Sequence, residues 1–361
     1  MIYYLIFCVL IGASFLRKFG PEIERFMYFF LLFFLFVFCA FRYEIGCDWV
    51  TYEEIYAYDS AVYFFRQGGT LEFGYNLTMI GLKALGLGFQ SFNIVIALIF
   101  FAGLNAIAQR NINPIFFLAL AFPILIINLP MSGLRQAAAF GFLCFASISF
   151  IDKKMFRYIL FVILATSFHS SAIIFLFLSP FLRFELTATN ILLALILVAP
   201  ISGLLLTSSY GGIAISRYVE SDLQSAGSYF RLGLLFLVGS YFLIFLNSSW
   251  KKLFPNDYKF ILLSSLAMLG CFLAILPIST VIADRLGYYL WIPALMILGR
   301  MQTIPNRYRQ ISVASSFIGL LLVFSLWANY SYFFDRCYTP YQFKFFASDH
   351  HSLNFSHQKI V

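Results

Sequence analysis

The sequence predicts an all-α polytopic integral membrane protein, and three observations support this fold class. The 361-residue chain is 61% hydrophobic and only 11% charged, whereas a soluble domain has about 25% charged residues. Its mean hydropathy is +0.87. Its apolar residues gather in long runs, the pattern of helices that cross a membrane.

Twelve apolar runs are long enough to cross, or nearly cross, a bilayer. Several fall short of the roughly 20 residues that a perpendicular span needs, so those helices must extend into flanking polar residues or lie in locally thin membrane. We therefore expect about 12 transmembrane helices, in the runs 2–16, 26–41, 89–108, 114–129, 136–150, 156–168, 170–182, 187–206, 232–247, 260–276, 286–298 and 311–329.

Two further segments need interpretation. The run 2–16 follows Met1 with no basic region and no small-residue cleavage site, so it is interpreted as a first span rather than a removable signal peptide. The stretch 75–87 has helical periodicity but contains Lys83 and several glycines. It is therefore interpreted as an interfacial or re-entrant helix.

The basic residues predict the orientation of the chain. Of the 24 lysines and arginines, ten lie in long segments, including 42–88, 207–231 and the tail. The other fourteen lie in short loops, and their density marks those loops as cytoplasmic. Both termini then face outward. The fourteen are Arg17, Lys18, Arg25, Arg110, Lys153, Lys154, Arg157, Arg183, Lys251, Lys252, Lys259, Arg300, Arg307 and Arg309.

This topology requires one pair of short crossings. Lys153 and Lys251 can both be cytoplasmic only if the segment 156–182 crosses twice, with a turn at His169. Because the two crossings are short, the turn is expected slightly below the outer surface, as the wall of a pocket would be.

The chain is expected to form one multi-spanning membrane domain, residues 1–330, with outer loops at 42–74 and 207–231, followed by an outer tail, 331–361. The net charge of +8 is explained by orientation, so no nucleic-acid partner is expected. The six cysteines have no metal-binding spacing, and neither metal nor cofactor is expected. A disulfide between Cys47 and Cys337 is conceivable because both lie in outer segments.

The predicted outer face collects the unusual polar residues. Six of the sixteen carboxylates lie in one polar island, 44–72, between apolar runs. Further polar groups stand at the edges of other runs, where ionisable side chains are costly. Each taken alone also fits a helix end or a headgroup anchor. The set comprises Arg42, Asp48, Glu72, Arg135, Gln136, His169, Arg217, Asp284 and Arg285.

Their chemistry suggests roles at one site. Arg135 and Gln136 open a helix, and an arginine at a helix N-terminus suits a phosphate or diphosphate. Asp48, Glu72, His169 and Asp284 are the candidates for a general base. Spacing does not choose among them. Glu53, Glu54 and Asp59 are typical of a solvated face.

Six short motifs, in order, carry a resemblance to a known family. The motifs are Arg42-Tyr43-x-x-Gly46-x-Asp48-Trp49-x-x-Tyr52, Glu72-Phe73-Gly74-Tyr75-Asn76, Leu134-Arg135-Gln136-x-x-Ala139, Phe168-His169-x-Ser171-Ala172, Asp284-Arg285-x-x-x-Tyr289 and Tyr338-x-Pro340-Tyr341. In this order they resemble the EpsG-type family of Wzy oligosaccharide repeat-unit polymerases over nearly the whole chain. Glu72-Phe73-Gly74 differs from the more usual glutamate-proline-glycine.

The resemblance implies a glycosyltransferase that acts on undecaprenyl-diphosphate-linked oligosaccharides at the outer face of a bacterial cytoplasmic (inner) membrane. Its products would be surface polysaccharides such as O-antigen of lipopolysaccharide, capsule or exopolysaccharide. Whether a chain-length regulator binds it as a partner stays open. Catalysis is expected from Asp48, Glu72, His169 and Asp284. Substrate binding is expected from Arg42, Tyr52, Arg135, Gln136, Arg217, Arg285 and Tyr289.

Two other readings remain open on the residues alone. A lipid-linked oligosaccharide flippase or other transporter also needs many helices and a basic cavity, although a transporter usually holds ionisable residues near the bilayer midplane. An O-antigen ligase or a polyprenyl-phosphate-sugar glycosyltransferase would have similar outer loops. Substrate assays separate these classes.

Overall fold

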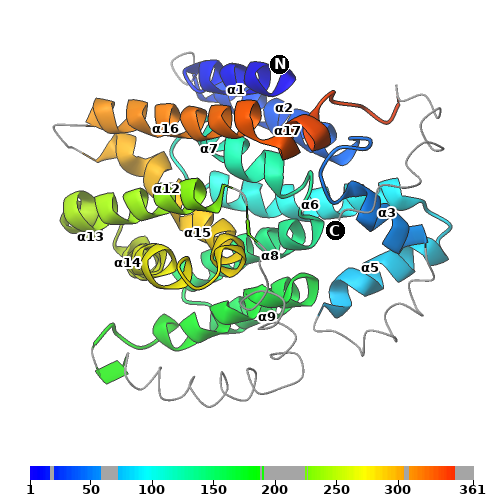
Figure 1. Ribbon diagram of the computed structural model, residues 1–361. Coiled ribbons are helices and arrows are strands. Elements are labelled where there is room, and N and C mark those ends of the chain that lie inside the picture. Colours follow the sequence, from blue (N-terminus) through cyan, green and yellow to red (C-terminus); the bar gives the residue numbers. More distant parts are fainter. Residues whose placement is uncertain are drawn as a thin grey trace.

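The computed structural model describes residues 1–16, 20–57, 72–187, 189–190, 224–225, 227–304 and 309–345. Within these ranges every regular element is a helix, and the one strand-like pairing is an isolated bridge between Arg42 and Phe343 (Figure 1). The predicted all-helical membrane protein is confirmed at this level.

Seven described helices or helical runs are long and apolar enough to cross a membrane, and four shorter apolar helices accompany them. Together they correspond to eleven of the twelve predicted runs. The remaining run, 187–206, lies almost wholly outside the described residues. The count of about 12 spans therefore stays a prediction.

The long elements are α2 (Pro21–Ala40), α6 (Phe89–Ala108), α8 (Leu134–Ile151), α12–η4–α13 (Ser228–Tyr241, Phe242–Leu246, Asn247–Leu253), α14–η5 (Pro255–Gly270, Cys271–Ile275), α15–η6 (Thr280–Arg300, Met301–Thr303) and α16 (Arg309–Tyr330). The shorter ones are α1 (Ile2–Ala13), α7–η2 (Pro114–Ala121, Phe122–Ile126), α9 (Met155–Phe168) and η3 (Ser170–Leu182).

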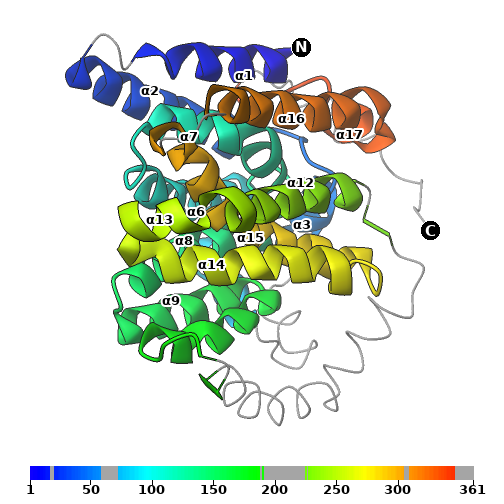
Figure 2. The ribbon, with the colours of Figure 1, turned by 90° about the vertical axis from the view of Figure 1, so that its left-hand side faces the viewer.

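Helices α8 and α15 form the centre of the bundle. Over an 18-residue stretch of each helix, 72% of the residues of α8 and 78% of those of α15 are buried inside the protein, whereas only 11% of those of α16 are. Both views place α1 and α16 along one side of the bundle and α9 along the opposite side (Figures 1 and 2). The central position of α15 matters because the predicted site residues Asp284, Arg285 and Tyr289 belong to it.

Helices α6 and α8 pack at backbone contact. A Cβ added at Gly103 would overlap the carbonyl oxygen of Gly141, and a Cβ at Gly141 would overlap that of Ile99. Small residues let helices in a membrane approach this closely. This packing fixes where α8 begins, and so where Arg135 stands.

The segment 156–182 forms the predicted pair of antiparallel elements. α9 ends at Phe168, His169 is extended, and η3 returns along α9. The second element is a 3₁₀-helix, which rises about 2.0 Å per residue instead of 1.5 Å. Its 13 residues therefore reach about 26 Å rather than about 20 Å, a greater length than an α-helix of the same residues would give the predicted crossing.

One end of the bundle gathers residues that the topology predicts to be cytoplasmic. Arg110 and Asp152 form a two-pronged ion pair, with both N–O distances 2.9 Å. Arg300 pairs with Asp257 and donates to the Arg110 carbonyl oxygen at 3.0 Å. Lys259 donates to the carbonyl oxygens of Phe181, in the last turn of η3, and of Phe184, just beyond it. These contacts tie the ends of α6, α8, η3, α14 and α15 together.

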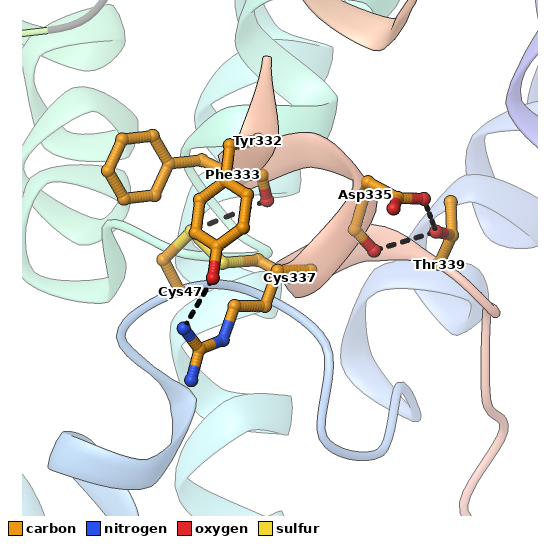
Figure 3. Close-up of a disulfide and its surroundings, with 7 residues drawn as sticks. Cys47, Tyr332, Phe333, Asp335, Cys337 and Thr339 are labelled. Carbon is orange, nitrogen blue, oxygen red and sulfur yellow. Dashed lines mark hydrogen bonds between the residues drawn. A yellow bond between two sulfur atoms is a disulfide. The ribbon is translucent and has the colours of Figure 1, made fainter. Parts of the chain in front are cut away.

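The opposite end holds α3 (Trp49–Ala57), α5 (Phe73–Ala84) and α17 (Tyr332–Tyr338), and α3 and α5 lie on the right in Figure 1. α5 is the helix predicted over 75–87. A disulfide joins Cys47 to Cys337 and so attaches α17 to the loop before α3 (Figure 3). Backbone hydrogen bonds from Tyr43 to Gln342 and from Lys344 to Phe41 extend this attachment.

Candidate functional site

Glu72, His169 and Arg135 form a buried ionic cluster at the α3–α5 end. Glu72 stands at the N-terminus of α5, Arg135 in the first turn of α8, and His169 between α9 and η3. Glu72 Oε2 lies 2.7 Å from Arg135 Nη1, and Glu72 Oε1 lies 2.9 Å from His169 Nδ1. The Ser170 backbone N–H also donates to Oε1, at 3.1 Å. Three segments far apart in the sequence thus meet on one carboxylate.

The environment assigns the protons within this cluster. Burial raises the pKa of Glu72, but hydrogen bonds from His169 and Ser170 and the charge of Arg135 outweigh it and bring that pKa to about 2. Burial lowers the pKa of His169 despite its contact with Glu72. At neutral pH the pair is therefore a carboxylate and a neutral imidazole. Nδ1–H donates to Glu72, which leaves Nε2 with a lone pair that can accept a proton.

Arg135 has an aromatic support and a partly open guanidinium. Its guanidinium carbon lies 5.6 Å from the centre of the Tyr75 ring, and the Tyr52 hydroxyl is within hydrogen-bonding reach. The Arg135 side chain is 44% exposed, whereas Glu72 is 12% exposed and His169 10%. Arg135 can therefore hold Glu72 and still meet an anionic ligand.

Asp48 lies near the same cluster. It reaches the surface just before α3, yet surrounding protein partly desolvates its carboxyl, which raises its pKa against the opposing charges of Arg135 and Arg285. A carboxyl whose pKa is shifted by burial beside charged partners is a candidate for a functional group.

Helix α15 contributes the other wall. Gln136 Nε2 donates to the Arg285 carbonyl oxygen at 2.6 Å, which joins the starts of α8 and α15. The Tyr289 and Ser171 hydroxyls are 3.1 Å apart, which joins α15 to η3. The positive charge of Arg285 acts on Asp48, His169 and Tyr289. Predicted residues from four loops therefore lie together.

Two glycines permit these approaches. A Cβ at Gly74 would overlap the Ser167 hydroxyl, so only glycine lets the first turn of α5 lie against the end of α9. Gly46 has a φ of +103°, and a Cβ there would overlap the Met131 carbonyl. The two positions bring Glu72 to His169 and Asp48 toward Arg135.

Arg42 lies apart from the cluster. Its side chain is buried, and its guanidinium donates to the carbonyl oxygens of Cys39, Ile45 and Met131 and to Asn93. It closes the end of α2 and holds the loop before α8. This placement does not support the predicted contact with phosphate.

Asp284 also has a partner that the sequence did not indicate. Arg231, in the first turn of α12, donates Nε–H and Nη2–H to its two oxygens at 2.8 Å each, and Ser225 donates at 2.7 Å. A carboxylate held by two arginine N–H groups is poorly placed to act as a general base. Arg231 was missed because α12 was predicted to begin after it. The predicted ligand Arg217 lies outside the described residues.

No group of three His, Cys, Asp or Glu residues in the described ranges is arranged to hold a metal ion.

The fold and this cluster define a helical membrane protein with a charged, partly buried site at one end. The profile of the EpsG family matches residues 25–343. The chain therefore belongs to the EpsG family. The kind of protein known in this family is the Wzy-type polymerase. It is thereby related to membrane proteins of polysaccharide biosynthesis. Neither a curated protein nor a solved structure matches the chain.

Proposed function

We propose that this protein is a glycosyltransferase that polymerises undecaprenyl-diphosphate-linked oligosaccharide repeat units at the outer face of the cytoplasmic membrane. The observation that carries the proposal is the cluster of Glu72, His169 and Arg135, beside Asp48 and Arg285, in a chain of the EpsG family. It combines a base with positive charge for a diphosphate.

His169 is the proposed general base. A sugar hydroxyl of the incoming lipid-linked unit attacks the first sugar carbon of the growing glycan, and its proton passes to His169 Nε2. Glu72 holds Nδ1–H at 2.9 Å and stabilises the imidazolium that forms. This is the role that a buried carboxylate has beside a catalytic histidine. Asp48, with its raised pKa, is the second candidate.

Arg135 and Arg285 serve the leaving group. As the new carbon–oxygen bond forms, the bond between the sugar carbon and the diphosphate oxygen breaks, and its electron pair leaves on the undecaprenyl diphosphate. Fixed positive charge where negative charge develops lowers the barrier. The partly exposed guanidinium of Arg135 is suited to that position.

The disulfide supports an outward-facing site. Cys47 is the neighbour of Asp48, and disulfides persist outside the cytoplasm, where conditions are oxidising. This agrees with the charge count, which assigns the same end to the outside. An outward site meets lipid-linked units after they have crossed the membrane.

The deciding experiment removes one nitrogen. His169→Asn keeps an N–H donor where Nδ1 stands but has no counterpart of Nε2. Purified protein in liposomes, given a lipid-linked repeat unit, should elongate roughly 10²- to 10⁴-fold more slowly with this variant. Glu53→Gln, on the exposed face of α3, is the control and should elongate normally. Equal elongation by both variants would remove His169 from the mechanism.

A deletion strain separates the other classes. Surface polysaccharide reduced to single capped units identifies a polymerase. Loss of all surface material identifies a flippase or an earlier enzyme, and long chains left on the lipid carrier identify a ligase.

A further inference from the structure

An apolar groove lies between η3, α14–η5 and α15, in the half of the bundle nearest the ionic cluster. It encloses a volume of about 210 Å³. One wall comes from Phe175 and Leu178 of η3, a second from Leu263 and Ala267 of α14, and the floor from Leu286 and Leu290 of α15.

Shared neighbours link the groove to the ionic cluster. On α15, Arg285 and Tyr289 lie one turn apart, and Leu286 and Leu290 follow them by one residue on the adjoining face. The Phe175 ring, in the groove, contacts the Tyr289 ring at a centroid distance of 5.7 Å, and the Tyr289 hydroxyl lies 3.1 Å from Ser171. Ser171 follows the two residues that contact Glu72.

The helices that form the groove have apolar outer surfaces. Beside it on α14–η5, Leu266 is 52% exposed and Leu273 62%, and Ile174 on η3 is 39% exposed. Such exposure is stable in lipid and costly in water. Ile174 and the exposed Ala267 also line the groove, so the groove reaches this apolar surface.

Charge and polarity together select the occupant. The groove lining is apolar apart from Ser264 and Cys271. Arg285 directly precedes the lining residue Leu286 on α15, and the charges of Arg285 and Arg135 both act on Asp48 in the neighbouring cluster. An amphiphile with a diphosphate head and a hydrocarbon tail matches this arrangement. We infer that the groove between η3, α14–η5 and α15 binds the first isoprene units of a polyprenyl diphosphate, with the diphosphate at Arg285 and Arg135.

This inference rests on the proposed function for its choice of lipid, but its test does not need turnover. The probe is undecaprenyl diphosphate without sugar, titrated onto the full-length protein in nanodiscs. Ala267→Trp fills the groove from the exposed side of α14. Leu266→Trp places the same indole ring one residue away, outside the groove lining, and is the control.

We expect wild type and Leu266→Trp to bind with similar Kd, and Ala267→Trp to bind at least about tenfold more weakly. A second pair of variants adds the bulk only after folding. Ala267→Cys and Leu266→Cys are purified in the folded state and then labelled with a bulky maleimide. Only the label at 267 should block binding. Absence of saturable binding to wild type, or equal effects at 266 and 267, would overturn the inference.

Elongation assays on the same proteins keep the two proposals apart. Binding that depends on position 267 in a protein that never elongates would retain the groove and reject the polymerase. Normal elongation and unchanged binding by Ala267→Trp would retain the polymerase and reject the groove.

Discussion

Glu72 is the residue on which the cluster depends, because it accepts hydrogen bonds from Arg135, His169 and the Ser170 backbone. The sequence identified Glu72, Arg135 and His169 as candidates, since ionisable groups at the edges of apolar runs are costly and need a reason. It gave no means of ranking them. Only their distances show which carboxylate holds the histidine.

The pH dependence of elongation tests the protonation states in this cluster. Burial lowers the pKa of His169, so the ring stays neutral below its ordinary value of about 6.5. We expect the elongation rate to hold as pH falls through that value, and to decline only at lower pH, where His169 takes up a proton.

Glu72→Gln provides the complementary measurement. The carboxylate raises the pKa of His169, so its removal should shift the acidic limb to still lower pH, while the rate at neutral pH drops because the imidazolium loses its counter-charge. A limb centred at or above pH about 6.5, or one that moves upward in Glu72→Gln, would contradict this assignment.

Residue pairs across helices were the least predictable part of the site. Asp284 and Arg285 are sequence neighbours, but adjacent residues on a helix point in different directions, and Asp284 pairs with Arg231 of α12 instead. Arg42 and Asp48 belong to the same motif, yet the Arg42 side chain is buried in the protein. A motif records which residues occur together and leaves the direction of each side chain open.

Among the elements, apolar runs predicted helices well and their internal geometry poorly. The break at His169 followed from the parity of the charged loops. The 3₁₀ form of η3 and the π-helical turns η2, η4 and η5 did not. These depend on packing against neighbouring helices, which a hydropathy pattern does not contain.

The contact of α5 with α9 gives a prediction at this scale. Gly74→Ala should push the first turn of α5 away from Ser167 and Phe168 and so separate Glu72 from His169. Overpacking of this kind costs about 1–3 kcal/mol, which the bundle should withstand. We expect at least about a tenfold loss of elongation at normal abundance, because displacement of a catalytic group by about 1 Å can cost on the order of 10²-fold in rate.

Gly81→Ala is the matched control in the same helix. A Cβ at Gly81 has no atom within 4 Å, and alanine favours a helix over glycine. It should elongate like wild type in the same liposome assay. Equal activity of the two variants would mean that the approach of α5 to α9 does not position Glu72.

Over the whole molecule, charged contacts collect at two opposite ends and the apolar centre lies around α8 and α15. The charge count anticipated this division, because loops of the same side must meet at one end. The structure agrees with the grouping: Arg110, Asp152, Asp257 and Arg300 lie at one end, and the ionic cluster lies at the other. The direction of the molecule in the membrane stays a prediction.

That direction is the last prediction, and two independent measurements address it. Reporter fusions after Lys154 and Lys252 should give a cytoplasmic signal, and a fusion after Ser228 should give an outer one, because basic density marks the first two loops as inner. The disulfide should be present in cells, because the predicted orientation places its end in an oxidising compartment. Protein denatured without reductant should then leave Cys47 and Cys337 unlabelled by a mass-tagged maleimide, and reductant should add two tags. Cys144→Ser, which removes a free buried cysteine, controls for the tag count. A cytoplasmic signal at Ser228 together with labelled Cys47 would turn the molecule over, and the site would face nucleotide-activated sugars instead of lipid-linked units that have already crossed.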